Sequence, residues 1–235
     1  MWCKIICVFL LVFCVSAEEK VPSKVLNLKN WKITLPVNKS GSKKPVEISQ
    51  PELAEFSHEK HFFVHKKGGV VFRAHCTSVT TKNSKYPRSE LREMNGSKRA
   101  SWDTGKGTHT MEIVQAVTAL PKVKKHIVCA QIHDEEDDLI MIRLEDKKLF
   151  VESKGRKIRT LNSNYELNTI FSVKISVQND IIKVYYNDLL KMEKEMPAKG
   201  CYFKAGCYTQ SNPDKGDGPD SFGEVIIYDL KVSHE

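Results

Sequence analysis

The sequence predicts an all-β protein, a sandwich or barrel built from many short strands. Apolar and polar residues alternate with a period of two through most of the chain after residue 70. Short turns separate these segments at regular intervals, as is typical of such folds. The 235 residues suit one large domain with a sizeable core, and they contain neither an internal repeat nor a domain linker.

The N-terminus resembles a secretory signal peptide. Lys4 precedes an apolar run over residues 5–15, and small residues stand just before Glu18. The run is too short to cross a membrane as a helix. We expect cleavage after Ala17, which leaves residues 18–235 as a single secreted, extracellular domain.

The mature chain is expected to begin with a polar lead-in over residues 18–30 and a first strand over 31–37, followed by a loop at 38–44. The clearest helix start lies at residues 49–56. Ser49 and Glu52 fit a capping box, and Pro51 fits the first turn of a helix. We therefore expect about two turns of helix there.

From residue 70 onward the pattern is that of strands. We expect them at 70–74, 88–94, 109–117, 131–133, 140–145, 149–151, 173–177, 182–186 and 202–210. The Asn-Asp pairs at 179–180 and 187–188 are expected to be turns between neighbouring strands.

Three of these strands have one apolar face and one face of chemically functional side chains. In the segment 202–210, Tyr202, Lys204, Gly206, Tyr208 and Gln210 alternate with small or apolar residues. Such a face is typical of a groove floor that holds an anion, with a solvated strand face as the alternative.

The two other strands favour the groove. Arg88, Glu90 and Arg92 share one face of the segment 88–94, and Gln131 and His133 share one face of the segment 131–133. Any one such pattern arises by chance, whereas the three together are specific.

The three segments resemble a known family. RSELRE at 88–93, QIH at 131–133 and YFKAG-x-Y-x-Q at 202–210 are similar, in that order, to the three motifs of the alginate lyases of polysaccharide lyase family 7. The resemblance extends from WKITLP at 31–36 to the closing segment 224–230. It implies a β-jelly roll sandwich of two curved antiparallel sheets, with the motifs on a concave substrate groove. No metal and no cofactor is implied.

The resemblance also implies roles for individual residues. The positions that match the catalytic residues of the family are Arg88, Gln131, His133 and Tyr208. Those that match its substrate-contacting residues are Arg92, Tyr202, Lys204 and Gln210. Glu90 joins the substrate-binding set, because a carboxylate between two arginines stays ionised and orients them.

The chemistry of these side chains disfavours a hydrolase, which usually needs two carboxyl groups. Glu90 is the only carboxylate on the three functional faces, and an ionised carboxylate is a poor general acid. β-Elimination on a uronate suits the set better. Arg88 and Gln131 can hold the substrate carboxyl group, His133 can act as base, and Tyr208 can protonate the leaving oxygen.

Lys204 and Arg92 are expected to place positive charge beside Tyr208 and to bind neighbouring uronates. We expect an endo-acting alginate lyase, because strand faces build an open groove. Ile132 in the QIH motif implies a preference for guluronate-containing blocks, because isoleucine at that position goes with this activity in the family. Two alternatives are a non-catalytic jelly-roll lectin for acidic polysaccharides and a lyase for another polyuronate.

The net charge fits a polyanionic partner. It is +8 for the chain, or +7 after removal of Lys4, the only charged residue among residues 1–17. A recognition-helix pattern for nucleic acid is absent from the sequence. We expect a monomer that binds alginate and that binds neither nucleic acid nor a membrane.

Four cysteines remain after cleavage: Cys76, Cys129, Cys201 and Cys207. Secretion permits two disulfide bonds among them, with three possible connectivities. A bond between Cys201 and Cys207 needs a kink, because six strand residues span roughly 20 Å.

Three further features of the sequence allow two interpretations each. Asn38 and Asn95 begin glycosylation sequons if the source is a eukaryote. The five acidic residues at 134–138 indicate a solvated turn rather than a calcium loop, because their spacing is not that of an EF-hand. The polar loop 211–221 is either a lid over the groove or a passive surface loop.

Overall fold

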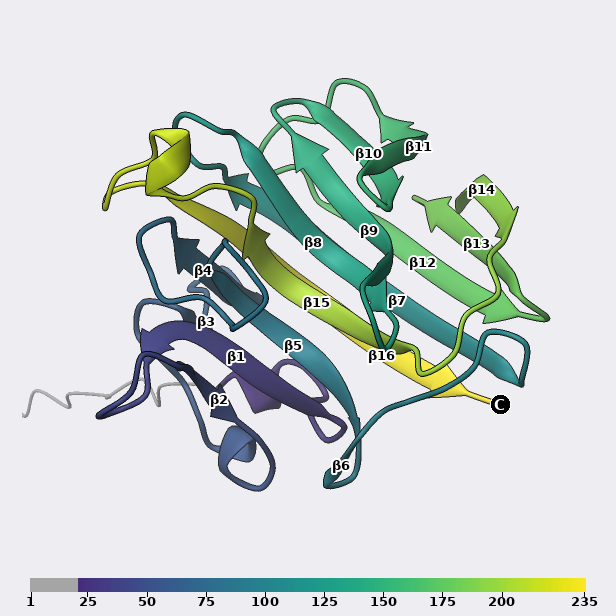
Figure 1. Cartoon of the computed structure of the whole chain (residues 1–235), viewed down its shortest axis with the longest axis horizontal. Coiled ribbons are helices and arrows are strands. Elements are labelled where there is room, and N and C mark those ends of the chain that lie inside the picture. Colours follow the sequence, from purple (N-terminus) through teal and green to yellow (C-terminus); the bar gives the residue numbers. More distant parts are fainter. Residues whose placement is uncertain (1–20) are drawn as a thin grey trace, which may run out of the picture.

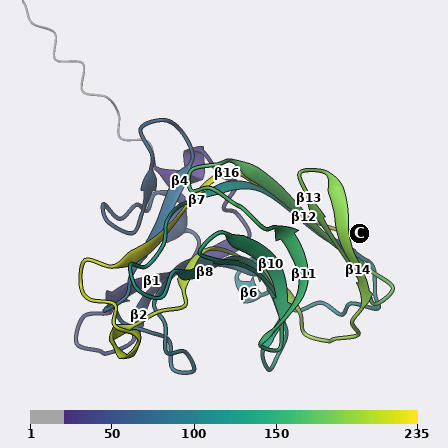
Figure 2. The ribbon, with the colours of Figure 1, turned by 90° about the horizontal axis from the view of Figure 1, so that it is seen from above.

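The computed structural model of the protein describes residues 21–235 and consists of two stacked antiparallel β-sheets (Figure 1). The predicted signal peptide, residues 1–17, lies outside the described residues. Both sheets curve in the same direction, and one lies inside the curve of the other (Figure 2). The predicted all-β jelly roll is confirmed.

The inner sheet has nine strands in the order β11-β10-β9-β8-β15-β5-β1-β2, with β6 paired to β5. Their bounds are β1 (Trp31–Asn38), β2 (Pro45–Ile48), β5 (Arg88–Asn95), β6 (Lys98–Arg99), β8 (His126–His133), β9 (Asp138–Glu145), β10 (Lys148–Ser153), β11 (Arg156–Asn162) and β15 (Tyr202–Thr209). The strands that contain the three motifs, β8, β15 and β5, are therefore direct neighbours.

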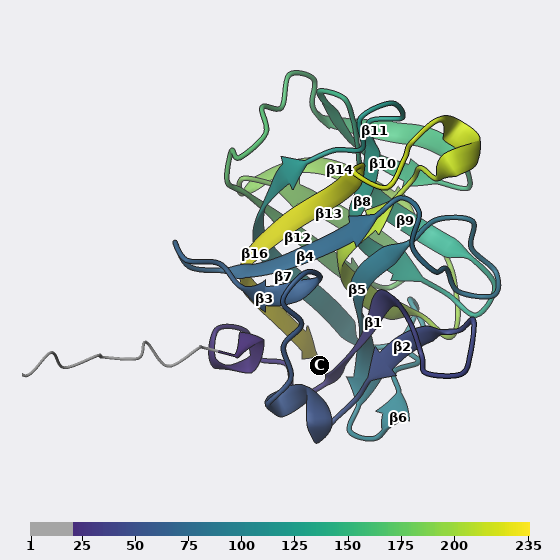
Figure 3. The ribbon, with the colours of Figure 1, turned by 90° about the vertical axis from the view of Figure 1, so that its left-hand side faces the viewer.

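The outer sheet has seven strands in the order β14-β13-β12-β7-β16-β4-β3. They are β3 (Phe62–Val64), β4 (Val70–His75), β7 (Thr108–Ala119), β12 (Phe171–Gln178), β13 (Ile181–Tyr186), β14 (Leu189–Glu195) and β16 (Phe222–His234). Figure 3 shows the side of the molecule where β3 and β4 lie beside β16.

The core lies between the sheets and explains the alternation in the motif strands. Leu91, Ile132 and Phe203, one from each of these strands, are fully buried in one continuous apolar cluster with residues of the outer sheet such as Phe72 and Val225. Because successive side chains of a strand point to opposite faces, burying these residues turns their motif neighbours away from the core. Packing thus holds the functional face of β5, β8 and β15 in place.

The two Asn-Asp turns form as predicted. Asn179 and Asp180 connect β12 to β13 with φ angles of 50° and 62°, and Asn187 and Asp188 connect β13 to β14 with 47° and 64°. Asparagine and aspartate tolerate this left-handed conformation, and two consecutive residues in it match the twist of a hairpin.

The predicted two-turn helix is wrong. Residues 52–54 form a single 3-10 turn, η2 (Glu52–Ala54), and Pro51 rather than Ser49 is its N-cap, with no side-chain capping bond. The fully buried side chain of Leu53 ties this turn to the core. The turn contacts a second one, η1 (Pro22–Lys24), which packs on β3. A third 3-10 turn, η3 (Pro213–Lys215), lies in the loop before β16.

The predicted disulfide bonds are not present among the described residues. Cys76, Cys129, Cys201 and Cys207 are all buried free thiols. Free cysteine behaves as a small apolar side chain, and here the four thiols fill space in the interior. Within residues 21–235, no helix is long and apolar enough to cross a membrane.

Candidate active site

Strand register brings the three motifs together on the inner sheet. On β15, Lys204 lies opposite both Arg92 of β5 and Gln131 of β8. Two residues further along, Gly206 lies opposite Glu90, and Tyr208 lies opposite Arg88. At the other end of the strand, Tyr202 pairs with His133. Side chains that the sequence separates by 69 to 120 residues thus occupy adjacent positions on one sheet face.

Glu90 is the centre of the cluster. Its carboxylate, only 2% exposed, accepts hydrogen bonds from Arg88 Nη1 at 2.9 Å and Lys204 Nζ at 2.6 Å on the same oxygen. Its other oxygen accepts a hydrogen bond from the side-chain amide of Gln131. One carboxylate therefore fixes three donors from three strands.

The charged groups in the cluster shift one another's pKa. Burial raises the pKa of Glu90, but Lys204 and Arg88 lower it more, so the net pKa lies below the ordinary value and the carboxylate stays ionised. Burial, with Arg88 beside it, lowers the pKa of Lys204 to about 8. The sequence predicted an ionised Glu90 between two arginines; its partners are instead Arg88, Lys204 and Gln131.

Arg88 also lies over Tyr208, with its guanidinium carbon 3.7 Å from the ring centroid. The sequence predicted that Lys204 and Arg92 supply positive charge there. Lys204 instead pairs with Glu90, and Arg92 lies over Tyr202 at 3.8 Å. Alternation along strands predicts which side chains share a face, but the cross-strand partner depends on register.

The backbone favours one neutral tautomer of His133. Its Nδ1 lies 2.8 Å from the carbonyl oxygen of Asp134. A carbonyl oxygen only accepts, so Nδ1 carries the hydrogen, which leaves Nε2 of the neutral ring with a free lone pair. Burial lowers the pKa of His133 below its ordinary value. The ring stacks on Tyr202, with centroids 5.2 Å apart.

The hydroxyl of Tyr208 has a partner that the motifs did not indicate. It lies 3.0 Å from Ser84 Oγ, in the turn that precedes β5. Tyr86, two residues on, lies beside Tyr208, and its own hydroxyl accepts a hydrogen bond from Lys124 Nζ at 3.3 Å. Ser84 and Tyr86 precede the RSELRE segment, and no strand periodicity in that turn could have predicted their direction.

Gly206 and Gln210 have structural constraints that strand alternation did not indicate. Gly206 has a φ of +135° at a bulge between β15 and β8, and a Cβ there would lie 2.6 Å from the Ser89 carbonyl oxygen. Close backbone approach therefore requires glycine at this position. Gln210 lies just beyond β15, is buried, and donates its side-chain amide to the Thr209 carbonyl.

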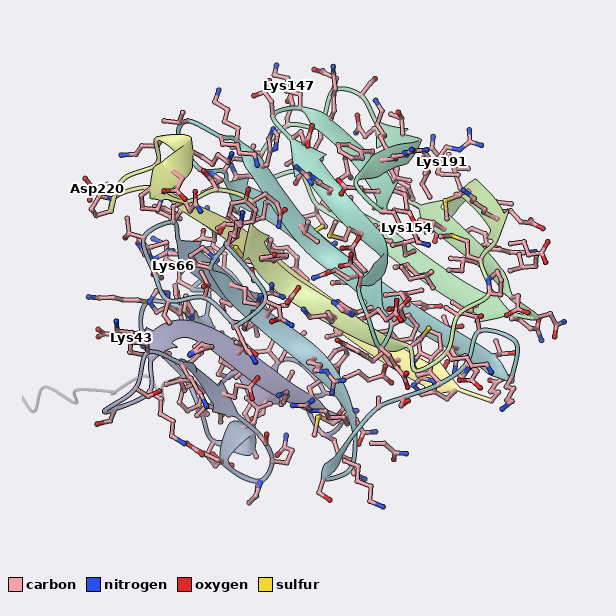
Figure 4. All side chains as sticks on the ribbon, viewed as in Figure 1. Lys43, Lys66, Lys147, Lys154, Lys191 and Asp220 are labelled. Atoms are coloured by element: carbon pink, nitrogen blue, oxygen red, sulfur yellow. The ribbon has the colours of Figure 1, made fainter. Side chains whose placement is uncertain are left out.

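Donors in the cluster remain available. Nε of Arg88 and Nη1 of Arg92 are buried and have no hydrogen-bond partner within residues 21–235. Buried donors are normally satisfied, so both are candidates to bind an anion. The lysines labelled in Figure 4 lie outside this cluster, in turns or on the edge strand β14: Lys43, Lys66, Lys147, Lys154 and Lys191.

The loop 211–221 is fixed to the body at Asp217. This buried carboxylate accepts hydrogen bonds from the Ser211 and Ser221 hydroxyls and from the backbone N–H groups of Val123 and Lys124. Burial raises the pKa of Asp217, but these donors outweigh it and lower the pKa to about 2. A loop whose centre is bonded to its own two ends and to the backbone of Val123 and Lys124 fits the passive alternative better than a lid.

The acidic run forms a tight turn. Asp134 accepts hydrogen bonds from the backbone N–H groups of Glu136 and Asp137, each at 2.8 Å. Among the described residues, no group of three His, Cys, Asp or Glu side chains is arranged to hold a metal ion. Asn38 and Asn95, which begin the two sequons, are both exposed.

The cluster combines arginine donors that are unpaired within residues 21–235 with a neutral imidazole and a phenol, which are the kinds of group that elimination on a uronate needs. Comparison with known proteins agrees. The family model for alginate lyase matches residues 26–234. The chain therefore belongs to the alginate lyase family, polysaccharide lyase family 7.

Solved structures of the family are similar to this one over nearly the whole chain. Alginate lyase AlgAT5 from polysaccharide lyase family 7 is 52% identical, with a TM-score of 0.89, covering 92% of this chain and 99% of that one. The alginate lyase from Corynebacterium sp. is 43% identical, with a TM-score of 0.88 and the same coverage. A curated alginate lyase of Klebsiella pneumoniae is 35% identical over 89 residues, which span 36% of this chain and 29% of that protein.

Proposed function

We propose that this protein is a secreted alginate lyase that cleaves the polymer internally by β-elimination. One observation supports this most strongly. Arg88, Gln131, His133 and Tyr208 gather on one open sheet face around a carboxylate, Glu90, whose oxygens already accept three hydrogen bonds. The only carboxyl group in the cluster is thus committed to positioning, and the remaining groups are those that an elimination needs.

The first requirement is an acidic C5 proton. The Arg88 guanidinium and the Gln131 amide bind the uronate carboxyl group at the cleavage site and stabilise the negative charge that develops on it. Each group also donates to Glu90, which leaves other donor hydrogens for the substrate. Glu90 and Lys204 serve as the support that holds these two donors at a fixed separation.

The second requirement is proton transfer. A base removes the C5 hydrogen, the electron pair forms the C4=C5 double bond, and the C4–O4 bond breaks. Tyr208 gives its proton to O4, so the products are one chain with a new hydroxyl group and one with an unsaturated uronate at its non-reducing end. His133, with Nε2 free and a lowered pKa, is the base suited to neutral solution.

The geometry of the sugar decides which residue acts as base. In guluronate, H5 and O4 lie on opposite faces of the ring, so two side chains are needed: His133 as base and Tyr208 as acid. In mannuronate they lie on the same face. There Tyr208, starting as the phenolate, can take H5 and give that proton to O4, while His133 helps to hold the carboxyl group. Because both residues are present, and Ile132 separates Gln131 from His133, we propose activity on guluronate-containing blocks at least equal to that on mannuronate.

Two alternatives are less well supported. A lectin needs neither a neutral imidazole with a free nitrogen nor a phenol beside a carboxylate site. A lyase for another polyuronate would use the same groups on a different sugar. Secretion is proposed from residues 1–17 alone. A monomer with alginate as its partner remains a proposal.

The test is a single assay on block-pure polymers. The protein is incubated with polyguluronate, polymannuronate, mixed alginate and a pectin-type polygalacturonate. Ultraviolet absorbance follows the new double bond, and chromatography follows product length. We expect absorbance to rise on alginate, with a broad range of early oligomers that indicates internal cleavage. Polymer binding without absorbance would support the lectin, and activity only on polygalacturonate would support the other lyase.

A further inference from the structure

The hydrogen bond between Ser84 and Tyr208 can be analysed by counting hydrogens. Ser84 Oγ has three close polar neighbours: the Tyr86 N–H at 3.1 Å, the Tyr86 carbonyl oxygen at 3.0 Å and the Tyr208 hydroxyl at 3.0 Å. A serine hydroxyl has one hydrogen and two lone pairs. The N–H can only donate and the carbonyl can only accept. For all three contacts to be hydrogen bonds at once, the single serine hydrogen must therefore point to the carbonyl.

The third neighbour must then be a donor. The remaining lone pair of Ser84 accepts the hydrogen of the Tyr208 phenol. The phenol hydrogen therefore points to Ser84 before substrate binds. The lone pairs of the phenol oxygen do not bond to Ser84 in this state.

The turn that contains Ser84 is attached to β15 beyond Tyr208. The Pro87 carbonyl accepts hydrogen bonds from both the backbone N–H and the hydroxyl of Thr209. The Lys85 carbonyl accepts one from the Asn212 side chain at 3.1 Å. These bonds fix Ser84 relative to Tyr208, so the contact between them belongs to the folded framework of the site.

We propose that Ser84 is a positioning residue that serves both protonation states of Tyr208. This inference rests on the proposed function, in which Tyr208 gives its proton to O4. When substrate binds, the phenol hydrogen turns from Ser84 to O4. As the phenol O–H bond breaks and the O4–H bond forms, negative charge develops on the phenol oxygen. The Ser84 hydroxyl turns its hydrogen from the Tyr86 carbonyl to that oxygen. Ser84 thus accepts from the phenol and donates to the phenolate. A proton from water restores the phenol after the product leaves.

The expected effect follows from the value of a hydrogen bond to a charged group. Because the bond to the phenolate forms only as the proton leaves, its loss should lower kcat and leave KM unchanged. Ser84→Ala is expected to reduce kcat on alginate by about 10- to 100-fold. Ser84→Thr keeps a hydroxyl and is expected to restore kcat to within a few-fold of wild type.

A control separates this role from support of the turn. Asn212→Ala removes the bond to the Lys85 carbonyl, and so loosens the same turn without touching the phenol. The two bonds from Thr209 to the Pro87 carbonyl remain and still hold Ser84 beside Tyr208. We therefore expect the substitution to lower thermal stability at most modestly and to leave kcat unchanged. If Asn212→Ala and Ser84→Ala lower kcat equally, or if Ser84→Thr fails to restore it while folding normally, the proposal is wrong.

A second measurement does not depend on turnover. The protein is labelled with ¹³C at tyrosine Cζ, and the resonance absent from Tyr208→Phe identifies Tyr208. Ser84→Ala is expected to shift that resonance, whereas Ser84→Thr and Asn212→Ala leave it in place. If the wild type does not cleave alginate but the resonance shifts as expected, the proposed function fails and the contact stands. An unshifted resonance in Ser84→Ala would overturn the contact itself.

Discussion

Glu90→Gln tests the claim that one buried carboxylate holds the site together. The substitution keeps the shape of the side chain and removes its charge. It leaves Arg88 and Lys204 buried without their counter-ion, and it places one amide group against another at Gln131. Removing one partner of a buried ion pair typically costs about 3–5 kcal/mol.

The lower end of that range is expected, because Lys204 can release its proton. With Glu90 present the pKa of Lys204 is already lowered to about 8, so loss of the carboxylate should leave much of it neutral near pH 7. A loss of about 3 kcal/mol corresponds to a fall in Tm of roughly 6–12 °C for a domain of this size. Activity should fall as well, since Gln131 loses its orienting acceptor.

The assay is thermal unfolding at pH 7, monitored by circular dichroism and calorimetry. The matched control is Glu112→Gln, which breaks an exposed ion pair with Lys174 at 3.0 Å on the outer sheet and should cost less than about 1 kcal/mol. If Glu90→Gln lowers Tm no more than Glu112→Gln, the carboxylate is not the support that we describe.

Four further predictions concern the base, the charge and the backbone of the site. His133→Ala should lower cleavage of polyguluronate by roughly 10²–10⁴-fold and that of polymannuronate by less; equal losses would refute separate roles. Because burial lowers the pKa of His133, wild-type activity on polyguluronate should persist below pH 6.5 and fall only as the pH drops through the lowered pKa, which a pH–rate profile checks. KM should rise steeply with ionic strength at fixed pH, because the Debye screening length falls to roughly 3 Å near 1 M salt. A KM that does not change would exclude recognition of the polymer through its charge. Gly206→Ala should prevent stable folding, because its Cβ would lie 2.6 Å from the Ser89 carbonyl oxygen. The control Gly218→Ala has open space around its Cβ, so its denaturant unfolding midpoint should equal that of the wild type.

The sequence predicted the central strands well because their two faces differ so sharply in chemistry. Leu91, Ile132 and Phe203 had to be buried, so the polar residues beside them had to face away from the core. The order of β8, β15 and β5 was not predicted, since local patterns do not specify which strands pair. The family resemblance implied only that the three motifs share one concave face. Short edge elements such as β2, β3 and β6 were missed because two to four residues are too few for a period to show.

The errors have physical causes that local patterns do not contain. Ser49 and Glu52 satisfied a capping signal, but burial of Leu53 and packing against η1 limit the segment to one 3-10 turn. The pairing of Lys204 with Glu90 depends on cross-strand register. Ser84 escaped notice because its importance comes from a contact with a residue 124 positions away.

The central claim is that Tyr208 supplies the proton to the leaving oxygen on this sheet face, and Tyr208→Phe tests it most directly. Phenylalanine keeps the ring beneath Arg88 and removes only the hydroxyl. Turnover on alginate, followed by ultraviolet absorbance, is measured beside polymer binding and Tm on the same preparation. We expect binding and stability close to wild type and nearly complete loss of turnover. Turnover within a few-fold of wild type would contradict the assignment.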